Sequence, residues 1–131
     1  MGLSKPVISL YDVPMWESMA RQRLELQTCA QCSRVRYPPA PICPHCLSMG
    51  YRWEPICGRA KILSWVIFHR QYFDDHKPPY NAVAVQLEEG PIVVTNLAGE
   101  VPAGNWIGAA VEFCYRQYGD RTVHQVRLRH A

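Results

Sequence analysis

The chain has 131 residues, of which 48% are hydrophobic and 11% aromatic, so it can fill the core of one ordinary domain and is not a disordered tail. Its formal net charge of +3 does not indicate a strong binder of polyanions such as nucleic acid. No stretch approaches the roughly 18 to 20 apolar residues that a membrane span needs, and the N-terminus lacks the apolar run of a signal peptide. We therefore expect a cytoplasmic protein.

Residues 1–28 are predicted to form a loose N-terminal segment followed by a helix. Pro14 suits the first turn of this helix. The apolar residues that follow have the spacing of one helical face: Trp16, Met19, Ala20 and Leu24. A helix of this length is marginally stable alone, so its apolar face must pack either on its own domain or on a partner chain. Both alternatives stay open, and these four residues are the candidates for a partner interface.

Residues 29–57 contain two Cys-x-x-Cys knuckles and show too little apolar periodicity to form a core unaided. Without a secretion signal, paired cysteines at this spacing indicate a metal site rather than disulfides. The predicted ligands are Cys29, Cys32, Cys43 and Cys46. Four thiolates match the closed tetrahedral sphere of one structural Zn²⁺ ion, with no open position for substrate. Iron, as in rubredoxin, uses the same ligands, and a redox dithiol is the remaining alternative.

Three other residues near this pattern are predicted not to bind the metal. His45 lies inside the second knuckle, where a spacer side chain points away from the ion. Cys57 and Cys114 stand beside apolar neighbours, and buried free cysteines of this kind usually act as small hydrophobic side chains. We therefore expect an exposed His45 and two buried, unreactive cysteines.

Residues 58–131 have the pattern of a small β-barrel. β-Branched and aromatic residues dominate residues 60–70, and Pro, Gly and Trp mark residues 98–108 as mostly connection. Two further pairs of segments are predicted hairpins, namely 81–87 with 92–97 and 110–118 with 123–129. Five such strands fit an oligonucleotide/oligosaccharide-binding (OB) barrel. The predicted fold is thus mostly β, with an N-terminal helix, a small rubredoxin-like zinc ribbon and a five-stranded OB-fold barrel.

A compact group of ionisable residues outside the ribbon is Asp74, Asp75 and His76. A carboxylate beside an imidazole can serve acid–base chemistry. However, adjacent residues in a proline-flanked loop diverge, and no nucleophile accompanies them. We expect a solvated loop and predict no catalytic residue.

Several short motifs follow one another in a specific order from Pro14 almost to the end of the chain. They are Trp16, residues 26–32 with Pro38 and Pro39, residues 43–46, Gly58 with residues 62–65, residues 79–85, residues 87–91, and Gly108 leading to residues 111–113. This order resembles the acyl-CoA-associated family, long filed as a domain of unknown function, in which a helix leads into a rubredoxin-like zinc ribbon and an OB-fold domain. Ser33 and Leu47 depart from such ribbons, where glycine often follows each knuckle. Cys57 departs from the family too, since a small hydroxyl residue or alanine is expected there.

The resemblance implies a non-catalytic, zinc-binding accessory subunit of an enzyme complex that processes acyl-CoA in lipid or sterol metabolism. Its partner would be a thiolase-like enzyme, an aldolase or an acyl-CoA hydratase, and its cofactor one structural Zn²⁺ ion. If a CoA thioester contacts this chain, basic side chains would meet its phosphates. The candidates are Arg34, Arg36, Arg59 and Lys61.

An alternative function is a single-stranded nucleic-acid-binding OB module, because exposed aromatic residues can stack on bases. The candidates are Trp65, Phe68, Tyr72 and Tyr80. Against this alternative, the aromatic residues alternate with core positions and the basic residues are scattered. Four thiolates and one Zn²⁺ ion would also lower the net charge to about +1.

Overall fold

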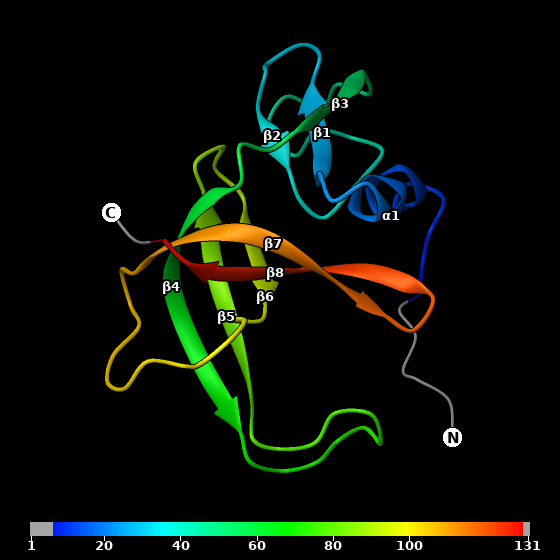
Figure 1. Cartoon of the computed structure of the whole chain (residues 1–131). Coiled ribbons are helices and arrows are strands. Elements are labelled where there is room, and N and C mark those ends of the chain that lie inside the picture. Colours follow the sequence, from blue (N-terminus) through cyan, green and yellow to red (C-terminus); the bar gives the residue numbers. More distant parts are fainter. Residues whose placement is uncertain (1–6, 130–131) are drawn as a thin grey trace.

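The computed structural model describes residues 7–129 and shows a helix, a small ribbon sheet and a larger curled sheet (Figure 1). The first six residues of the predicted segment 1–28 and the last two of 58–131 lie outside the described residues. The elements are α1 (Val13–Ala20), β1 (Glu25–Cys29), β2 (Val35–Arg36), β3 (Tyr51–Pro55), β4 (Arg59–Phe68), β5 (Tyr80–Leu87), β6 (Ile92–Thr95), β7 (Ala110–Tyr118) and β8 (Arg121–Leu128). The described part contains no helix that is long and apolar enough to cross a membrane.

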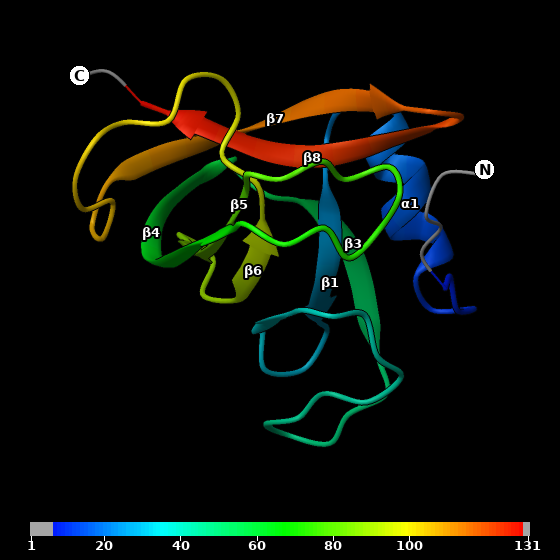
Figure 2. The ribbon, with the colours of Figure 1, turned by 90° about the horizontal axis from the view of Figure 1, so that it is seen from below.

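The small sheet carries the predicted ribbon. Its strand order is β2-β1-β3, all antiparallel, and Gln27 on β1 is paired with Arg36 on one side and Trp53 on the other. The sheet begins at Glu25, before the first cysteine of the predicted ribbon segment. Figure 2 shows the loops between β1 and β3 extending away from the curled sheet. The ribbon thus presents its cysteine loops at one end of the molecule.

The curled sheet confirms the predicted OB-type barrel. Its strand order is β6-β5-β4-β7-β8, all antiparallel, and both predicted hairpins are present as β5–β6 and β7–β8. The edges of this half-barrel meet at a short seam, where Leu97 and Val126 form an isolated parallel bridge. In the seam the Ala98 N–H donates to the Val126 carbonyl (2.8 Å) and the Val126 N–H donates to the Asn96 carbonyl (2.9 Å).

Alternate residues of the curled sheet point into one core, as the two-residue period of a strand requires. Those with no exposed surface are Ile62, Val83, Val85, Val93, Val111 and Val126. Trp106 also belongs to this core, although it lies in the segment that the sequence predicts to be connection. It is 3% exposed and stacks on Trp65 with ring centroids 4.3 Å apart. The segment between β6 and β7 therefore closes one side of the core.

The helix is shorter than predicted and buries a different face. It ends at Ala20, and Gln22 adopts a left-handed backbone (φ 57°), so Leu24 lies beyond the helix instead of on its face. Met19 and Leu24 are each 1% exposed, Ala20 is exposed and Trp16 is half-buried. Of the two alternatives left open, packing on the chain's own domain holds for Met19 and Leu24, where burial removes their apolar surface from water. A partner contact stays a prediction only for Trp16 and Ala20.

Leu24 joins the ribbon to the barrel. Its N–H donates to the hydroxyl of Tyr115 on β7 (2.8 Å), and its carbonyl accepts the N–H of Ile56, just after β3 (3.0 Å). Both backbone groups of this buried residue are therefore hydrogen-bonded, as burial requires. One residue thus contacts the end of the ribbon and a strand of the barrel.

We predict that Met19→Ala lowers the free energy of unfolding by about 2–5 kcal/mol, because it removes a fully buried side chain and leaves a cavity. Val13→Ala on the same helix should cost less than about 1 kcal/mol, because surface substitutions have small effects and this side chain is 40% exposed. Urea unfolding in zinc-containing buffer measures both variants. Equal losses for the two would show that the helix does not belong to the core.

Candidate metal centre and the surfaces beside it

Two turns of the same kind carry the four predicted ligands. In the first turn the Ser33 N–H donates to the Cys29 carbonyl (3.0 Å), and in the second the Leu47 N–H donates to the Cys43 carbonyl (3.0 Å). The Cys32 N–H also approaches the Sγ of Cys29, at 3.5 Å. Because each turn folds back on its first cysteine, both thiols of a knuckle face the same point.

The four thiols converge, and their sulfur atoms all lie within 4.8 Å of one another. The Sγ atoms of Cys29 and Cys46 are 3.5 Å apart, and those of Cys32 and Cys43 are 3.6 Å apart. A tetrahedral zinc site with Zn–S distances of about 2.3 Å separates its sulfurs by about 3.8 Å. The structure therefore brings the predicted ligands together in an arrangement that fits one structural Zn²⁺ ion.

The charges of this cluster require a cation. Hydrogen bonding from the Cys32 amide lowers the pKa of Cys29 to about 6, and the Cys46 amide likewise lowers the pKa of Cys43. The Ser48 amide acts in the same direction on Cys46, but burial and the neighbouring thiols outweigh it and raise that pKa to about 11. Four thiolates this close repel one another, so they cannot all ionise alone. A divalent ion offsets their charge and stabilises the fold.

Both knuckles place a residue with a side chain where glycine is preferred. Ser33 has φ 66° and Leu47 has φ 63°, the left-handed region in which a Cβ atom is strained. This conformation accounts for the glycine that is often found after such knuckles. Both turns form without glycine, so the backbone is strained at Ser33 and at Leu47.

Exposed apolar side chains surround the second knuckle, and the sequence did not single them out. Ile42, Leu47 and Met49 are 44%, 73% and 70% exposed, and we call them the knuckle patch. No periodic pattern could identify these residues, because the loop contains neither helix nor strand.

The other metal candidates have mixed outcomes. His45 is exposed and lies outside the cysteine cluster, as predicted, and Cys114 is half-buried. The prediction that Cys57 is buried is wrong, because it lies exposed in the link between ribbon and barrel. Its N–H donates to Glu89 (2.7 Å) and its thiol to Glu88 (3.4 Å). Partial burial and these carboxylates raise the pKa of Cys57.

The four predicted phosphate-binding residues do not form one site. Arg59 pairs with Glu88 (2.9 Å), and Lys61 lines a separate hollow on the barrel. Arg34 and Arg36 do lie together, in a hollow of about 400 Å³ between the ribbon and the β5–β6 turn. Only this pair therefore remains a shared candidate site.

The expectation of a solvated loop at residues 74–76 is wrong for two of its three residues. Asp74 is exposed, but Asp75 and His76 are half-buried. Asp75 accepts hydrogen bonds from the Tyr118 hydroxyl and from Nδ1 of His76 (3.0 Å). These contacts hold the loop against β7.

The aromatic residues of the nucleic-acid alternative mostly stack on one another. Trp65 stacks on Trp106, and Phe68 stacks on Tyr80 with centroids 4.9 Å apart. Tyr72 meets the edge of Phe68. Because three of the four rings are half-buried against other rings of the chain and only Tyr72 is largely exposed, the structure does not support a base-stacking platform.

The fold and the cysteine cluster define a protein that joins a zinc ribbon to an OB-fold domain. Family models agree, since the rubredoxin-like zinc ribbon domain of ChsH2 matches residues 16–51 and its C-terminal OB-fold domain matches residues 53–116. A DUF35 domain-containing scaffold protein of Methanothermobacter thermautotrophicus is 32% identical over 100 residues, covering 74% of each chain. The chain therefore belongs to the DUF35 family, which confirms the resemblance inferred from its motifs.

Two further similarities are to a probable hydratase subunit and to a solved aldolase structure. The chain is 34% identical over 107 residues to a probable enoyl-CoA hydratase alpha subunit of Thermomonospora curvata, covering 82% of this chain. It spans only about a third (34%) of the length of that relative. Among solved structures it superposes on the Ltp2-ChsH2(DUF35) aldolase with a TM-score of 0.87 and 30% identity, covering 95% of this chain and 98% of the other.

We predict about one zinc ion per purified chain, because the four thiolates form a single closed site. Cys29→Ser and Cys43→Ser should each lose the zinc and melt the ribbon, since metal binding supplies folding free energy. Cys57→Ser is the matched control and should keep the full zinc content. Metal analysis with circular dichroism measures both effects. Iron in place of zinc, or zinc retained in both ligand variants, would contradict the assignment.

A second prediction concerns the free thiols. In zinc-loaded protein Cys57 should react with an aromatic disulfide reagent before Cys114 does, because it is the more exposed thiol. Its rate at neutral pH should lie below that of a free cysteine and should rise in Glu88→Gln, because the thiolate is the nucleophile and removing the carboxylate favours it. Stopped-flow absorbance with Cys57→Ala and Cys114→Ala assigns the phases. Loss of the fast phase in Cys114→Ala would reverse the assignment.

Proposed function

We propose that this chain is a non-catalytic accessory subunit of a complex that acts on CoA thioesters, and that it binds its partner through the knuckle patch. Its relatives are named as a hydratase subunit, a scaffold protein and an aldolase. A hydratase, an aldolase or a thiolase-like enzyme would therefore supply the catalytic residues. The closed Cys₄ sphere of the ribbon leaves no metal position for a substrate.

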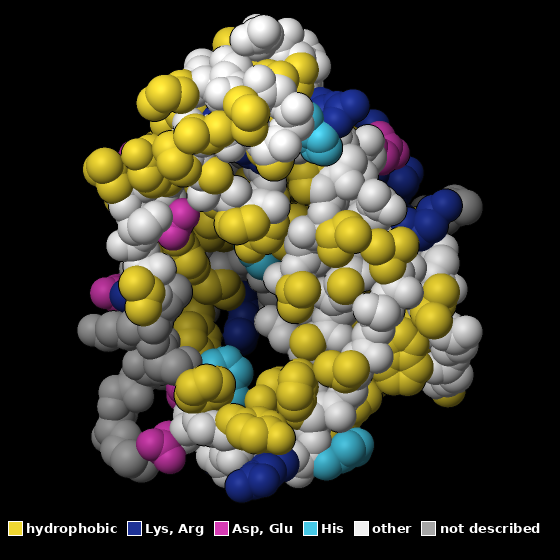
Figure 3. Space-filling model, turned by 180° about the vertical axis from the view of Figure 1, so that it is seen from behind, with side chains coloured by type: hydrophobic (Ala, Val, Ile, Leu, Met, Phe, Trp, Pro, Cys, Tyr) yellow, Lys and Arg dark blue, Asp and Glu magenta, His cyan; other side chains and the backbone are white. Residues whose placement is uncertain are grey.

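The observation that carries this proposal is the conformation of Leu47. A non-glycine residue in the left-handed region costs about 1–2 kcal/mol, and this side chain is also 73% exposed to water. Neither feature stabilises the isolated chain. Hydrophobic side chains gather over the ribbon in Figure 3. Ile42 and Met49, close to Leu47 in the sequence, are also exposed apolar residues. Strain and exposed apolar surface together are typical of an interaction site.

The metal gives this patch a fixed shape. Leu47 directly follows the ligand Cys46, and its N–H is held by the carbonyl of the ligand Cys43. A loop fixed by zinc in this way loses little conformational freedom when a partner binds. The structural ion would therefore contribute to assembly as well as to folding.

A buried cation near the patch suits a phosphate of CoA. Arg36 is 6% exposed, its Nε donates to Gln27 (3.0 Å) and its guanidinium lies over the ring of Tyr51 at 5.0 Å. Neither Nη atom has a hydrogen-bond partner among the described residues. A buried guanidinium with both Nη atoms unpaired is costly, and phosphate matches its geometry. We propose Arg36 with Arg34 for this contact, since both line the same hollow, to which Glu89 adds one carboxylate.

The test is co-expression with a hydratase, aldolase or thiolase-like enzyme of the same genome, followed by measurement of the complex by calorimetry. Leu47→Gly should weaken the complex at least tenfold. Without the partner, the full-length variant should keep its zinc and melt no earlier than wild type, because glycine relieves the backbone strain. Leu47→Asp with Met49→Asp should abolish the complex. Val101→Asp, at an apolar position that is 49% exposed in the segment between β6 and β7, is the control and should bind as wild type.

Two results would contradict the proposed function. If the Leu47→Asp, Met49→Asp variant bound the partner with full affinity, the knuckle patch would not be part of the interface. Turnover of a CoA thioester by the isolated, zinc-loaded chain would show that it is itself an enzyme. Assays for hydration, thiolysis and retro-aldol cleavage cover the reactions of the three partner classes.

A further inference from the structure

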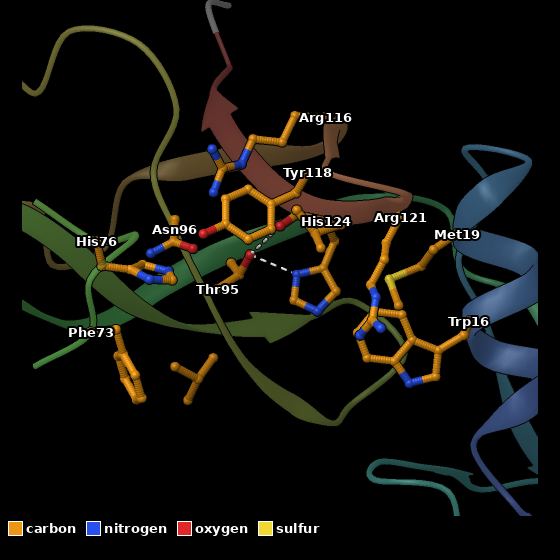
Figure 4. Close-up of a pocket in the computed structure, with 12 residues that line it drawn as sticks. Trp16, Met19, Phe73, His76, Thr95, Asn96, Arg116, Tyr118, Arg121 and His124 are labelled. Carbon is orange, nitrogen blue, oxygen red and sulfur yellow. Dashed lines mark hydrogen bonds between the residues drawn. The ribbon is translucent and has the colours of Figure 1, made fainter. Parts of the chain in front are cut away.

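A cavity of about 400 Å³ opens at the end of the half-barrel, between α1, the loop after β4 and the β7–β8 hairpin (Figure 4). Its apolar walls are formed by Trp16, Met19, Phe73, Val94 and Val123. In Figure 4 the side chains of α1 lie on one side and Phe73 on the other. Figure 3 shows the molecule hollowed between the helix side and the barrel, with basic and histidine side chains at the hollow. Its volume lies in the range of small-molecule sites.

The guanidinium of Arg121 is only weakly paired in this cavity. The side chain of Arg121 is 22% exposed, and its Nη1 is buried without a hydrogen-bond partner among the described residues. Its Nε lies 3.5 Å from Asp120, but that carboxylate is 84% exposed, so the pair is solvated and weak. Arg116 adds a second positive charge at the rim, above the ring of Tyr118.

The remaining polar groups do not cancel this charge. The Thr95 hydroxyl donates to the carbonyl of His124 (3.1 Å) and accepts from Nδ1 of the same residue (2.7 Å). Burial lowers the pKa of His124, so this imidazole is neutral near pH 7. No Asp or Glu is among the described residues that line the cavity. Asp75 is hydrogen-bonded to the lining residues Tyr118 and His76 and adds one nearby negative charge against the two arginines.

We propose that this cavity binds an organic anion, with a carboxylate on Arg121 and an apolar body between Trp16 and Phe73. A neutral ligand would leave Nη1 unpaired, which is costly in a buried place. A cation would be repelled by Arg116 and Arg121, and a purely inorganic anion would leave the apolar walls in water. An amphipathic carboxylate pairs its charge with Arg121 and covers the apolar walls with its hydrocarbon part. This site lies on the barrel and does not depend on the proposed function of the knuckle patch.

The test is an NMR titration of the ¹⁵N-labelled, zinc-loaded full chain with octanoate, and with octanol as the uncharged probe. Octanoate should give saturable shifts confined to the residues around the cavity. Octanol should bind at least tenfold more weakly. Equal affinity for the two probes, or octanoate shifts that spread over the surface without saturation, would overturn the proposal.

A matched pair of variants separates charge from shape. Val94 is 63% exposed on the cavity wall, so both Val94→Glu and Val94→Lys should fold. The glutamate should weaken octanoate binding at least tenfold by repulsion, and the lysine should preserve or strengthen it. Arg121→Gln should also lose at least tenfold, whereas Arg127→Gln, which removes an arginine paired with Glu112 (2.7 Å) on the same strand, should not. Identical affinities in the two Val94 variants, or in Arg121→Gln and wild type, would overturn the proposal.

Discussion

The meeting of four thiolates at one point is the constraint on which the N-terminal half of the structure depends. The ribbon strands are short, with β2 only two residues long, and in the loops at 30–34 and 37–50 the ligand Cys43 is the only buried residue. Backbone amides lower the pKa of Cys29, whereas burial and the neighbouring thiols raise the pKa of Cys46, so a cation is needed to hold all four cysteines as thiolates. The metal therefore determines whether the loops around it have a defined surface at all.

Leu24 links the zinc-stabilised ribbon to the barrel. β1 leaves the helix and runs directly to the first ligand, and Leu24 at its start bonds to Tyr115 and Ile56. Because this residue is buried between the two sheets, the ribbon and the barrel share one core. The knuckle loops therefore stand at a set position relative to the barrel, which suits a subunit that contacts an enzyme with one end.

The sequence predicted those features that depend on local pattern. The metal ligands, both hairpins and the order of ribbon and barrel follow from cysteine spacing, alternation and turn residues. Sequence-based prediction failed for the features that depend on tertiary packing. Neither the end of the helix at Ala20 nor the burial of Trp106 has a local signal, and periodicity wrongly extended the helical face to Leu24. The cavity could not be predicted, because Trp16 and Arg121 come together only in the folded chain.

The seam that joins the edges of the half-barrel has a consequence for motion. Only a few hydrogen bonds between residues 96–98 and Val126 hold it, whereas the neighbouring hairpins are paired along their length. Elements with few such bonds open at a lower free energy than the rest of a sheet, which amide hydrogen exchange detects. Thr95 and His124 flank this seam and are bonded to each other across it. Opening of the seam would therefore also break the Thr95–His124 bond and widen the cavity that both residues line.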